Sequence, residues 1–566
     1  MAFEKIPEPV ELARLSDLAE GSMKLVRAGG HRLCLVRTSE GVFALENACP
    51  HEGYGLVQGD LDGDELICEW HNWRFRVRDG ACVLGEEGVA THPVRVEGER
   101  VLVNIQEPDP AAARPVLAAS LRRGIEEHYV GQISRDVVRL LRADVAPVEL
   151  VWEAVAWGAP RAEFGFGHAL ASAHDCLALA DRVDGDARAL PVVQAITGIT
   201  EVEHLRPLRP SPEPLPSLPP DAAATFRRTV EQGWSRVADA EALLRTAIEE
   251  GTPPDELRRW LLGTVADHHL GYGHGAIYVR KAFELLDRLG WDRAATVLPS
   301  VVVAHLAMTR EDRLPYMRPF VRAMAAVDVT ALIDREPEDG WVDGGSLEAA
   351  LLGGPAAEVP AAVERAVRAG AGIEGILDAV ALAASERLLR YDPRVDFDLH
   401  EDFGWLDITH ALTYADAARW AWRAEPGPDT ARLALWTAFL ASYSGRRGYR
   451  EVPDPPLEPV AGDVGRAVAE GRADDAARAA LAGDRSEAAA TLEQAALSDL
   501  GGSFIVAAHL VKTACAAGHE AEATGSNRPL AAAARFLASP RMERFVASDV
   551  TRSVDFLSGR GPGARS

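Results

Sequence analysis

Positive charge and long apolar runs are both scarce in this chain. Its 566 residues include 60 Lys and Arg against 85 Asp and Glu, which gives a formal net charge of −25. That balance disfavours nucleic acid and anionic membrane surfaces as partners. No uncharged apolar run approaches about 18 residues, so we expect no membrane span. The first residues also lack the apolar core of a signal peptide.

Cysteine is scarce too, with six in the whole chain. Four of them are scattered in apolar contexts and are expected to be buried thiols rather than disulfides: Cys34, Cys82, Cys176 and Cys515. This use of cysteine favours a reducing, cytoplasmic setting.

The other two cysteines each precede a histidine at short range. Cys49-Pro50-His51 and Cys68-Glu69-Trp70-His71 are separated by residues 52–67. Two thiolates and two imidazoles in this order are what a Rieske-type [2Fe–2S] centre needs, because two Cys bind one iron and two His bind the other. The stretch resembles the Rieske ferredoxin family over residues 1–106.

The alternative for this motif is a structural zinc site, since Cys2His2 also suits tetrahedral zinc. In common zinc fingers, however, the Cys pair precedes the His pair, and here the two types alternate. Some high-potential Rieske proteins carry an extra Cys in each loop, joined as a disulfide. Here such loop positions hold residues like Tyr54 and Trp70, which indicates the ferredoxin-like or oxygenase-like type.

The periodicity of the chain changes after this motif region. Residues 1–106 contain short strand-like runs between Gly-rich turns, which predicts a small all-β domain. Residues 107–118, beginning Glu107-Pro108-Asp109-Pro110, are expected to be a linker. From 119 to 566, apolar residues recur every three or four positions, which predicts one large all-α domain.

The helical region repeats itself weakly around histidine. Residues 164–170 (Phe-Gly-Phe-Gly-His-Ala-Leu) resemble residues 270–276 (Leu-Gly-Tyr-Gly-His-Gly-Ala), which aligns His168 with His274. Residues 303–306 likewise resemble residues 507–510, and both contain Ala-His-Leu. A lone His on an apolar face is usually a core residue with one hydrogen bond. Several in small-residue contexts suggest stacked helices that bring histidines to one level.

His509 and Lys512 share one face of an apolar helix, since they are three residues apart. A buried lysine tends to be neutral, and a neutral amine can add carbon dioxide to give a carbamate, an anionic metal ligand. The alternative is a lysine that reaches the surface or meets one of the many carboxylates. The sequence leaves both interpretations open.

Several short motifs of the helical region resemble the questin oxidase-like family over residues 125–540. The motifs are His268-His269-Leu270-Gly271-Tyr272-Gly273, Thr309-Arg310-Glu311-Asp312, Asp407-Ile408-Thr409-His410 and His509-x-x-Lys512. The resemblance implies a helical fold, oxidation of aromatic polyketides, and a mononuclear non-haem iron held by several His and a lysine-derived ligand. His269, His410, His509 and Lys512 match best, with His410 and Lys512 as the catalytic pair, and His168 matches the family's early helical His. His274 competes with His269, and His305 and His174 are weaker candidates.

The two halves together suggest an oxygenase. An external reductase or ferredoxin reductase would reduce the Rieske cluster, and the cluster would pass electrons to iron that binds dioxygen beside an apolar aromatic substrate. Eight aromatic residues are candidates to line that site, or are simply core: Trp152, Trp157, Phe164, Phe166, Tyr272, Tyr278, Trp405 and Tyr414. Transfer within one chain and transfer between protomers of a homo-oligomer are both compatible with this organisation. The ordinary Rieske oxygenase holds its iron in a mixed α/β domain, so we do not assign the chain there.

A second hypothesis comes from another class of protein. The Rieske domain would be an electron-transfer or redox-sensing module, and the helical domain would only bind a partner or a ligand. The histidines of the helical region would then be core residues. Metal content beyond the cluster distinguishes the two hypotheses.

Overall fold

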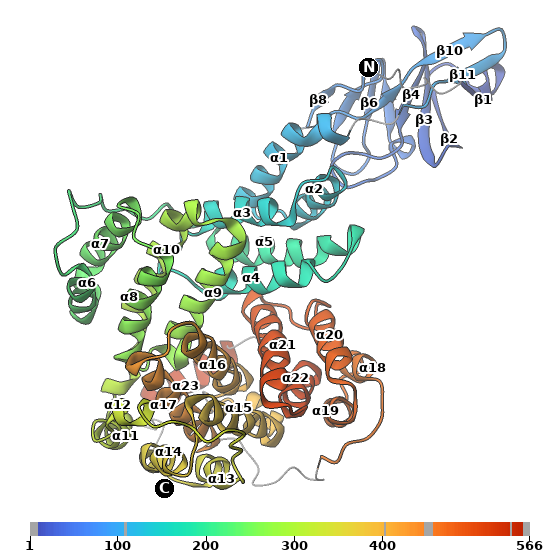
Figure 1. The fold of residues 1–566 in the computed structure, drawn as a ribbon. Coiled ribbons are helices and arrows are strands. Elements are labelled where there is room, and N and C mark those ends of the chain that lie inside the picture. The colour runs from blue at the N-terminus through green and yellow to red at the C-terminus, as the bar shows by residue number, and fades with distance from the viewer. Residues whose placement is uncertain are drawn as a thin grey trace. The chain divides into compact units, whose positions relative to one another are not determined.

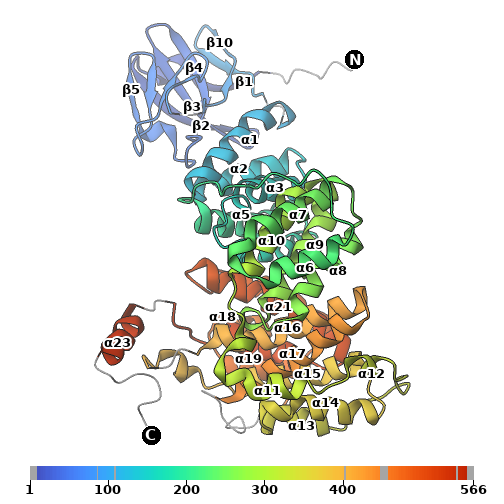
Figure 2. The ribbon, with the colours of Figure 1, turned by 90° about the vertical axis from the view of Figure 1, so that its left-hand side faces the viewer.

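The computed structural model describes residues 9–85, 87–106, 110–400, 403–446, 457–543 and 546–557. Two compact units divide the chain, Met1–Val145 and Ala146–Ser566. All named strands lie in the first unit and the second is helical (Figures 1 and 2). An all-β domain followed by a large helical region is therefore confirmed, as the two periodicities of the sequence predict.

Antiparallel sheets build the β part of the first unit. Their strand orders are β1-β11-β10, β2-β3-β4-β9 and β5-β6-β7-β8. The strands are β1 Val10–Arg14, β2 Ser22–Ala28, β3 His31–Thr38, β4 Gly41–Glu46, β5 Asp60–Asp62, β6 Glu65–Ile67, β7 Arg74–Arg76, β8 Cys82–Leu84, β9 Thr91–His92, β10 Val94–Glu97 and β11 Arg100–Val103. Cys49 and Cys68 belong to a buried cluster with Leu66 and Phe75, so the motif cysteines sit in the core.

A carboxylate and two imidazoles join three strands of one sheet. Glu46 at the end of β4 contacts His31 Nδ1 on β3 and His92 Nε2 on β9, the latter at 3.1 Å. His92 Nδ1 accepts from the backbone N–H of Gln106 at 3.1 Å, so its proton lies on Nε2 and is donated to Glu46. This tautomer leaves His92 without a free nitrogen for a metal. Although burial acts against it, hydrogen bonds from both histidines lower the pKa of Glu46.

The expected linker is helical over most of its length. Helix α1 spans Pro110–Glu127 and α2 spans Val130–Arg142; residues 107–109 lie outside the described part of the chain. The error has a physical reason: proline is favoured in the first turn of a helix, so Pro110 begins α1 rather than marking a linker. The hairpin belongs to the first unit, which extends to Val145, and Arg139 Nη1 of α2 donates to Glu87 Oε2 at 2.9 Å.

The second unit consists of helices. They are α3 Pro147–Gly158, α4 His168–Ala180, α5 Ala189–Glu203, α6 Ala222–Glu231, α7 Val237–Glu249, α8 Pro254–Ala266, α9 His274–Leu289, α10 Ala294–Ala307, α11 Arg318–Met324, α12 Val329–Ile333, α13 Ser346–Gly353, α14 Val359–Arg368, α15 Ile373–Arg390, α16 Trp405–Ala424, α17 Pro428–Tyr443, α18 Val464–Ala469, α19 Ala473–Ala482, α20 Arg485–Ala496, α21 Phe504–Thr524, α22 Arg528–Ala538 and α23 Val546–Leu557. Within the described ranges, no helix is long and apolar enough to cross a membrane.

Four of these helices pack in a closed ring. Helix α4 contacts α9, α9 contacts α16, α16 contacts α21, and α21 contacts α4. Their inner faces are apolar or uncharged over long stretches, with small residues such as Ala173, Ala276, Ala411 and Ala514 fully or almost fully buried. Small side chains allow helix axes to approach closely, so polar groups on the inner faces are brought together.

We expect Glu46→Gln to weaken the sheet that contains β3, β4 and β9. The amide keeps the size of the side chain but removes the charge that two imidazoles contact, and a hydrogen bond to a charged group contributes about 1.5–3 kcal/mol. Amide hydrogen exchange of β3 and β4 in the full chain should become at least about tenfold faster. Glu40→Gln is the matched control, since its pair with Arg78 is exposed and should cost less than about 1 kcal/mol.

The Glu46 effect should also depend on pH. Because the pKa of Glu46 is lowered in the folded chain, its contribution to stability is present above its usual pKa. It is lost as the pH falls through the folded-state value. Equal exchange rates in Glu46→Gln and the parent protein at neutral pH would contradict the assigned role of Glu46.

Candidate metal centres

The two Cys-His loops of the first unit are built alike. In the first loop, Cys49 N donates to Tyr54 O at 2.8 Å and Gly53 N donates to Cys49 O at 2.7 Å. In the second, Cys68 N donates to Trp73 O at 2.8 Å and Asn72 N donates to Cys68 O at 3.1 Å. Gly53 and Asn72, each fourth after its cysteine, both have positive φ, 78° and 57°, a conformation that Gly and Asn adopt at low cost.

Both loops direct their sulfur atoms inward and their imidazoles toward the tip. Cys49 and Cys68 are 2% and 1% exposed, and no disulfide joins them. The His51 and His71 ring centroids are 4.3 Å apart. Burial raises the pKa of the Cys49 thiol to about 12, so its thiolate needs a bound cation. Two thiols and two imidazoles converging from opposed loops fit a [2Fe–2S] cluster of the Rieske type.

The α1–α2 hairpin contributes to the outer edge of this centre. The Tyr129 hydroxyl, at the N-terminus of α2, lies 3.2 Å from His51 Nε2 and donates to Glu52. Glu52 Oε2 also lies 3.7 Å from His71 Nε2. A single carboxylate therefore contacts His71 directly and His51 through Tyr129. Neither Glu52 nor Tyr129 is predicted as a site residue from the sequence. Glu52 directly follows His51, which was a usable signal, whereas no sequence signal marks Tyr129.

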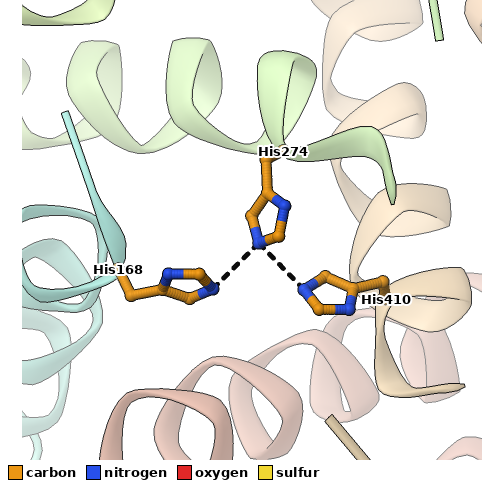
Figure 3. Close-up of side chains that lie close together, drawn as sticks. All are labelled: His168, His274 and His410. Atoms are coloured by element: carbon orange, nitrogen blue, oxygen red, sulfur yellow. Dashed lines mark hydrogen bonds between the residues drawn. The ribbon is translucent and has the colours of Figure 1, made fainter. Parts of the chain in front are cut away.

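Four histidines meet inside the ring of helices in the second unit. His168 begins α4, His274 begins α9, and His410 and His509 are each the sixth residue of α16 and α21. Figure 3 shows three of them, with His274 Nε2 2.8 Å from both His168 Nε2 and His410 Nε2. His509 Nε2 lies 3.3 Å from His410 Nε2. The sequence-predicted residues His168, His274, His410 and His509 are thus together.

The proton of each imidazole can be assigned from its other nitrogen. The Nδ1 atoms of His274, His410 and His509 donate to backbone carbonyls: Gly271 O, Asp407 O at 3.2 Å and Ile505 O at 2.7 Å. Carbonyl oxygens only accept, and a neutral imidazole has one N–H, so each Nε2 presents a lone pair. Lone pairs about 3 Å apart repel one another unless a cation lies among them. Nitrogens bound to one metal ion at about 2.0–2.1 Å have this spacing.

Lys512 lies beside the same nitrogens, with Nζ 3.2 Å from His410 Nε2. Burial lowers the pKa of Lys512 well below its usual value. Burial also lowers the pKa of His274 to about 3, and Lys512 acts in the same direction. The pKa values of His168, His410 and His509 are lowered well below the usual range for the same two reasons. The four imidazoles are therefore uncharged at neutral pH, and burial favours the neutral form of the Lys512 amine beside them.

His269 does not join the cluster, which corrects its prediction as a ligand. Its Nε2 contacts Glu311 Oε2 at 3.2 Å, and its ring stacks on Tyr414 at 5.9 Å. Glu311 Oε2 also accepts from Tyr272 N at 3.1 Å. His269 and Glu311 therefore hold the turn that leads into α9. That turn requires Gly273, which has φ 90° and where a Cβ would lie 2.3 Å from the Tyr414 ring.

The remaining candidates in the helical unit have other partners. His305 donates through Nε2 to Gly275 O at 3.3 Å. His174 Nδ1 lies 3.5 Å from Asp175 and 3.4 Å from Glu284. The resemblance between residues 303–306 and 507–510 therefore places only His509 in the cluster. Both His305 and His174 remain outside it.

A second layer of buried charges crosses the same helices. Lys281 Nζ of α9 lies 2.7 Å from Asp175 Oδ1 of α4. Arg419 Nη2 of α16 lies 2.8 Å from Glu520 Oε2 of α21. Arg280 of α9 pairs with Asp416 of α16. These pairs join the four helices below the histidines and fix their relative rotation and height.

A cavity of about 310 Å³ touches the cluster. His168 and Tyr278, whose hydroxyl lies 3.2 Å from His168 Nδ1, form part of its wall. Of the eight aromatic candidates, Phe164, Phe166 and Tyr278 line this cavity. Its lining residues do not include the other five: Trp152, Trp157, Tyr272, Trp405 and Tyr414. Most of the other lining side chains are apolar, including Ile199, Val202, Met308 and Phe504. The cavity therefore suits an apolar, aromatic molecule.

Comparison with known proteins identifies the first unit. Residues 8–95 match the Rieske [2Fe-2S] domain. The chain is 35% identical over 101 residues to the ferredoxin component of the alkene monooxygenase system of Xanthobacter autotrophicus, covering 83% of that protein and 18% of this chain. It is 32% identical over 98 residues to the naphthalene 1,2-dioxygenase ferredoxin of Pseudomonas putida, covering 94% of that protein and 17% of this chain.

Among solved structures, one match is the ferredoxin of carbazole 1,9a-dioxygenase from Nocardioides aromaticivorans IC177. The identity is 30%, the TM-score is 0.17, and the match covers 18% of this chain and 100% of that chain. Each of these similarities therefore reaches less than a fifth of the chain.

We expect the chelator-treated protein to lose stability as the pH falls from about 6.5 to about 3. Unfolded histidine binds a proton below about pH 6.5, whereas folded His274 has its pKa lowered to about 3. Each such group costs about 1.4 kcal/mol per pH unit across that window. His274→Gln removes this imidazole, so the stability of the folded chain should fall less between pH 7 and pH 5. The urea midpoint of unfolding, followed by the helical circular dichroism signal, measures this at both pH values.

His268→Gln is the control for this titration. Although burial acts against it, Asp312 and Glu231 raise the pKa of His268, so protonation of His268 stabilises the folded chain. Its removal should make the acid loss steeper rather than shallower. An unchanged pH dependence in His274→Gln would contradict a neutral, buried His274.

Proposed function

Because residues 8–95 make this chain a member of the Rieske [2Fe-2S] domain family, we propose that its Cys49, His51, Cys68 and His71 hold a [2Fe–2S] cluster. The paired loop geometry and the buried sulfur atoms support this assignment of the four ligands. Such a cluster carries one electron at a time and makes no bonds to substrate. The curated relatives are ferredoxin components of oxygenase systems, so we propose that an external reductase supplies the electron.

We further propose that the helical unit holds a mononuclear non-haem iron at His168, His274, His410 and His509. The carrying observation is that the Nε2 lone pairs of three imidazoles whose protons are fixed on Nδ1 converge within hydrogen-bonding distance. Imidazole ligands suit several transition metals, including zinc and iron. Iron is favoured over zinc because a one-electron carrier in the same chain has no use for a redox-inactive ion. Iron bound here would supply dioxygen activation.

Lys512 is proposed as a further ligand. Its amine lies beside His410 and burial lowers its pKa, so its neutral form can donate a lone pair directly or add carbon dioxide to become an anionic carbamate. Asp175, the carboxylate nearest in the charge layer, is already paired with Lys281 at 2.7 Å. A carbamate would therefore be the first negative charge within the cluster itself. The resemblance to the questin oxidase-like family supports a ligand derived from lysine.

The substrate site is proposed to be the cavity beside His168. Phe164, Phe166 and Tyr278 offer aromatic faces, and the burial of the cluster keeps bulk water from the reacting atoms. The function supported best is therefore an oxygenase in which a Rieske cluster delivers electrons to iron that oxidises an apolar aromatic molecule. Fusing carrier and oxygenase in one chain replaces diffusional encounter with a high effective concentration.

Metal analysis of His410→Ala tests the oxygenase proposal. Anaerobically purified parent protein should contain about three irons per chain, two in the cluster and one in the helical unit. His410→Ala should contain about two, with an unchanged Rieske EPR signal after reduction by dithionite. His519→Ala is the control, since His519 lies on α21 with His509 but pairs with Asp416 at 3.4 Å. It should retain the third iron.

The opposite outcome has a clear meaning. Parent protein with a Rieske signal and no further metal would refute the iron site. An electron-transfer or redox-sensing protein with a ligand-binding helical unit would then be the better interpretation.

We also expect Glu52→Gln to raise the reduction potential of the cluster. Reduction adds negative charge, and the carboxylate beside both ligand imidazoles opposes it, so removing that charge favours the reduced state. Glu97→Gln is the control because Glu97 pairs with Arg95 on an exposed edge strand, where salt screens its charge. Redox titration followed by EPR measures both. A potential in Glu52→Gln equal to or below that of the parent would contradict the placement of Glu52.

A further inference from the structure

Two carboxyl groups, those of Glu163 and Glu203, interrupt the largely apolar wall of the cavity beside His168. Glu203, the last residue of α5, lines the cavity and is 7% exposed. Among the described residues, its buried Oε2 has no hydrogen-bond partner. The nearest cation, Arg206 Nε, is 3.5 Å from that oxygen. Burying a polar atom without a hydrogen-bond partner costs free energy. A ligand that carries a hydrogen-bond donor would therefore be favoured at this position.

Two nitrogens of the Arg206 guanidinium already donate to groups of the chain. Its Nη1 donates to Glu163 Oε2 at 2.6 Å and its Nε donates to Val202 O at 3.2 Å. Two carboxyl groups therefore face one guanidinium at this wall. An anionic ligand would meet Glu163 and Glu203, and a cationic ligand would meet Arg206. A neutral donor is the class that neither charge opposes.

The state of the carboxyl group is consistent with a neutral partner. Burial raises the pKa of Glu203 to about 7, with Arg206 opposing and Glu163 adding to the shift. Both the protonated and the ionised carboxyl can accept from a hydroxyl group. Phenols are donors of this class that also carry the aromatic face which Phe166 and Tyr278 match.

We propose that Glu203 is a specificity-determining residue that accepts a hydrogen bond from a phenolic hydroxyl of an aromatic ligand in this cavity. The bond fixes which part of the ring system lies against His168. The inference rests on the proposed function only for the statement that this ligand is a substrate. Binding itself needs neither electrons nor dioxygen.

Equilibrium binding to the full-length protein under anaerobic conditions tests the proposal. The probes are 2-naphthol, 2-methoxynaphthalene, which lacks the donor, and naphthalene-2-carboxylate, which is an anion. Parent protein should bind 2-naphthol about tenfold or more tightly than either other probe, the cost of leaving a buried acceptor unpaired. In Glu203→Leu that preference should disappear, because the acceptor is gone while the apolar wall is kept.

Two further variants separate the role of Glu203 from general damage. Glu203→Gln keeps a neutral acceptor and should retain part of the preference for 2-naphthol. Glu249→Leu makes the same substitution at the exposed end of α7 and should leave the preference unchanged. Equal binding of 2-naphthol and 2-methoxynaphthalene to the parent would overturn the proposal. So would tighter binding of the carboxylate, an unchanged preference in Glu203→Leu, or no binding of any probe.

Metal content distinguishes this failure from failure of the proposed function. Protein without the third iron that still prefers 2-naphthol would uphold Glu203 and refute the oxygenase. Protein with the third iron that shows no preference would uphold the iron site and refute the role of Glu203.

Discussion

The helical unit depends on imidazole nitrogens that meet at its centre without a proton between them. Backbone carbonyls hold the protons of His274, His410 and His509 on Nδ1, so their Nε2 atoms approach one another with lone pairs only. Burial keeps the rings from gaining protons, because the charged imidazolium is disfavoured away from water. A bound cation would relieve the resulting repulsion and would stabilise the folded chain by mass action. Binding of the proposed metal and folding of this unit would then be linked.

Buried ion pairs keep the donors in register. Asp175 with Lys281 and Arg419 with Glu520 cross between helices that also carry the histidines. Replacing such pairs by apolar residues is often neutral for stability, so their value is better sought in specificity of packing. A helix that slipped by one turn would break its ion pair and move its imidazole about 5.4 Å. These buried ion pairs thus fix the register of the helices, which the small, apolar residues around them would not define.

Local motifs were readable from the sequence, and contacts between distant segments were not. The Cys-His loops could be located from the sequence, because each loop is contiguous. Choosing between His269 and His274 failed because the four residues between them form a turn that reverses the chain. The positive φ of Gly273 turns His274 into the ring and leaves His269 against Glu311. Tyr129 and Glu203 could not be identified from the sequence, because the loop that Tyr129 contacts and the cavity that Glu203 lines are formed by distant segments of the chain.

Tyr129 gives the imidazoles of the two Cys-His loops different surroundings. His71 is exposed at the tip of its loop, whereas His51 is half-buried with a phenol ring 5.6 Å away. His51 is therefore less hydrated than His71, so less water has to reorient around it when charge moves. If these imidazoles bind the proposed cluster, an electron-exchange partner would come closer to it at the exposed His71 than at His51, where the phenol lies. The proposed cluster would thus have a preferred side for electron exchange.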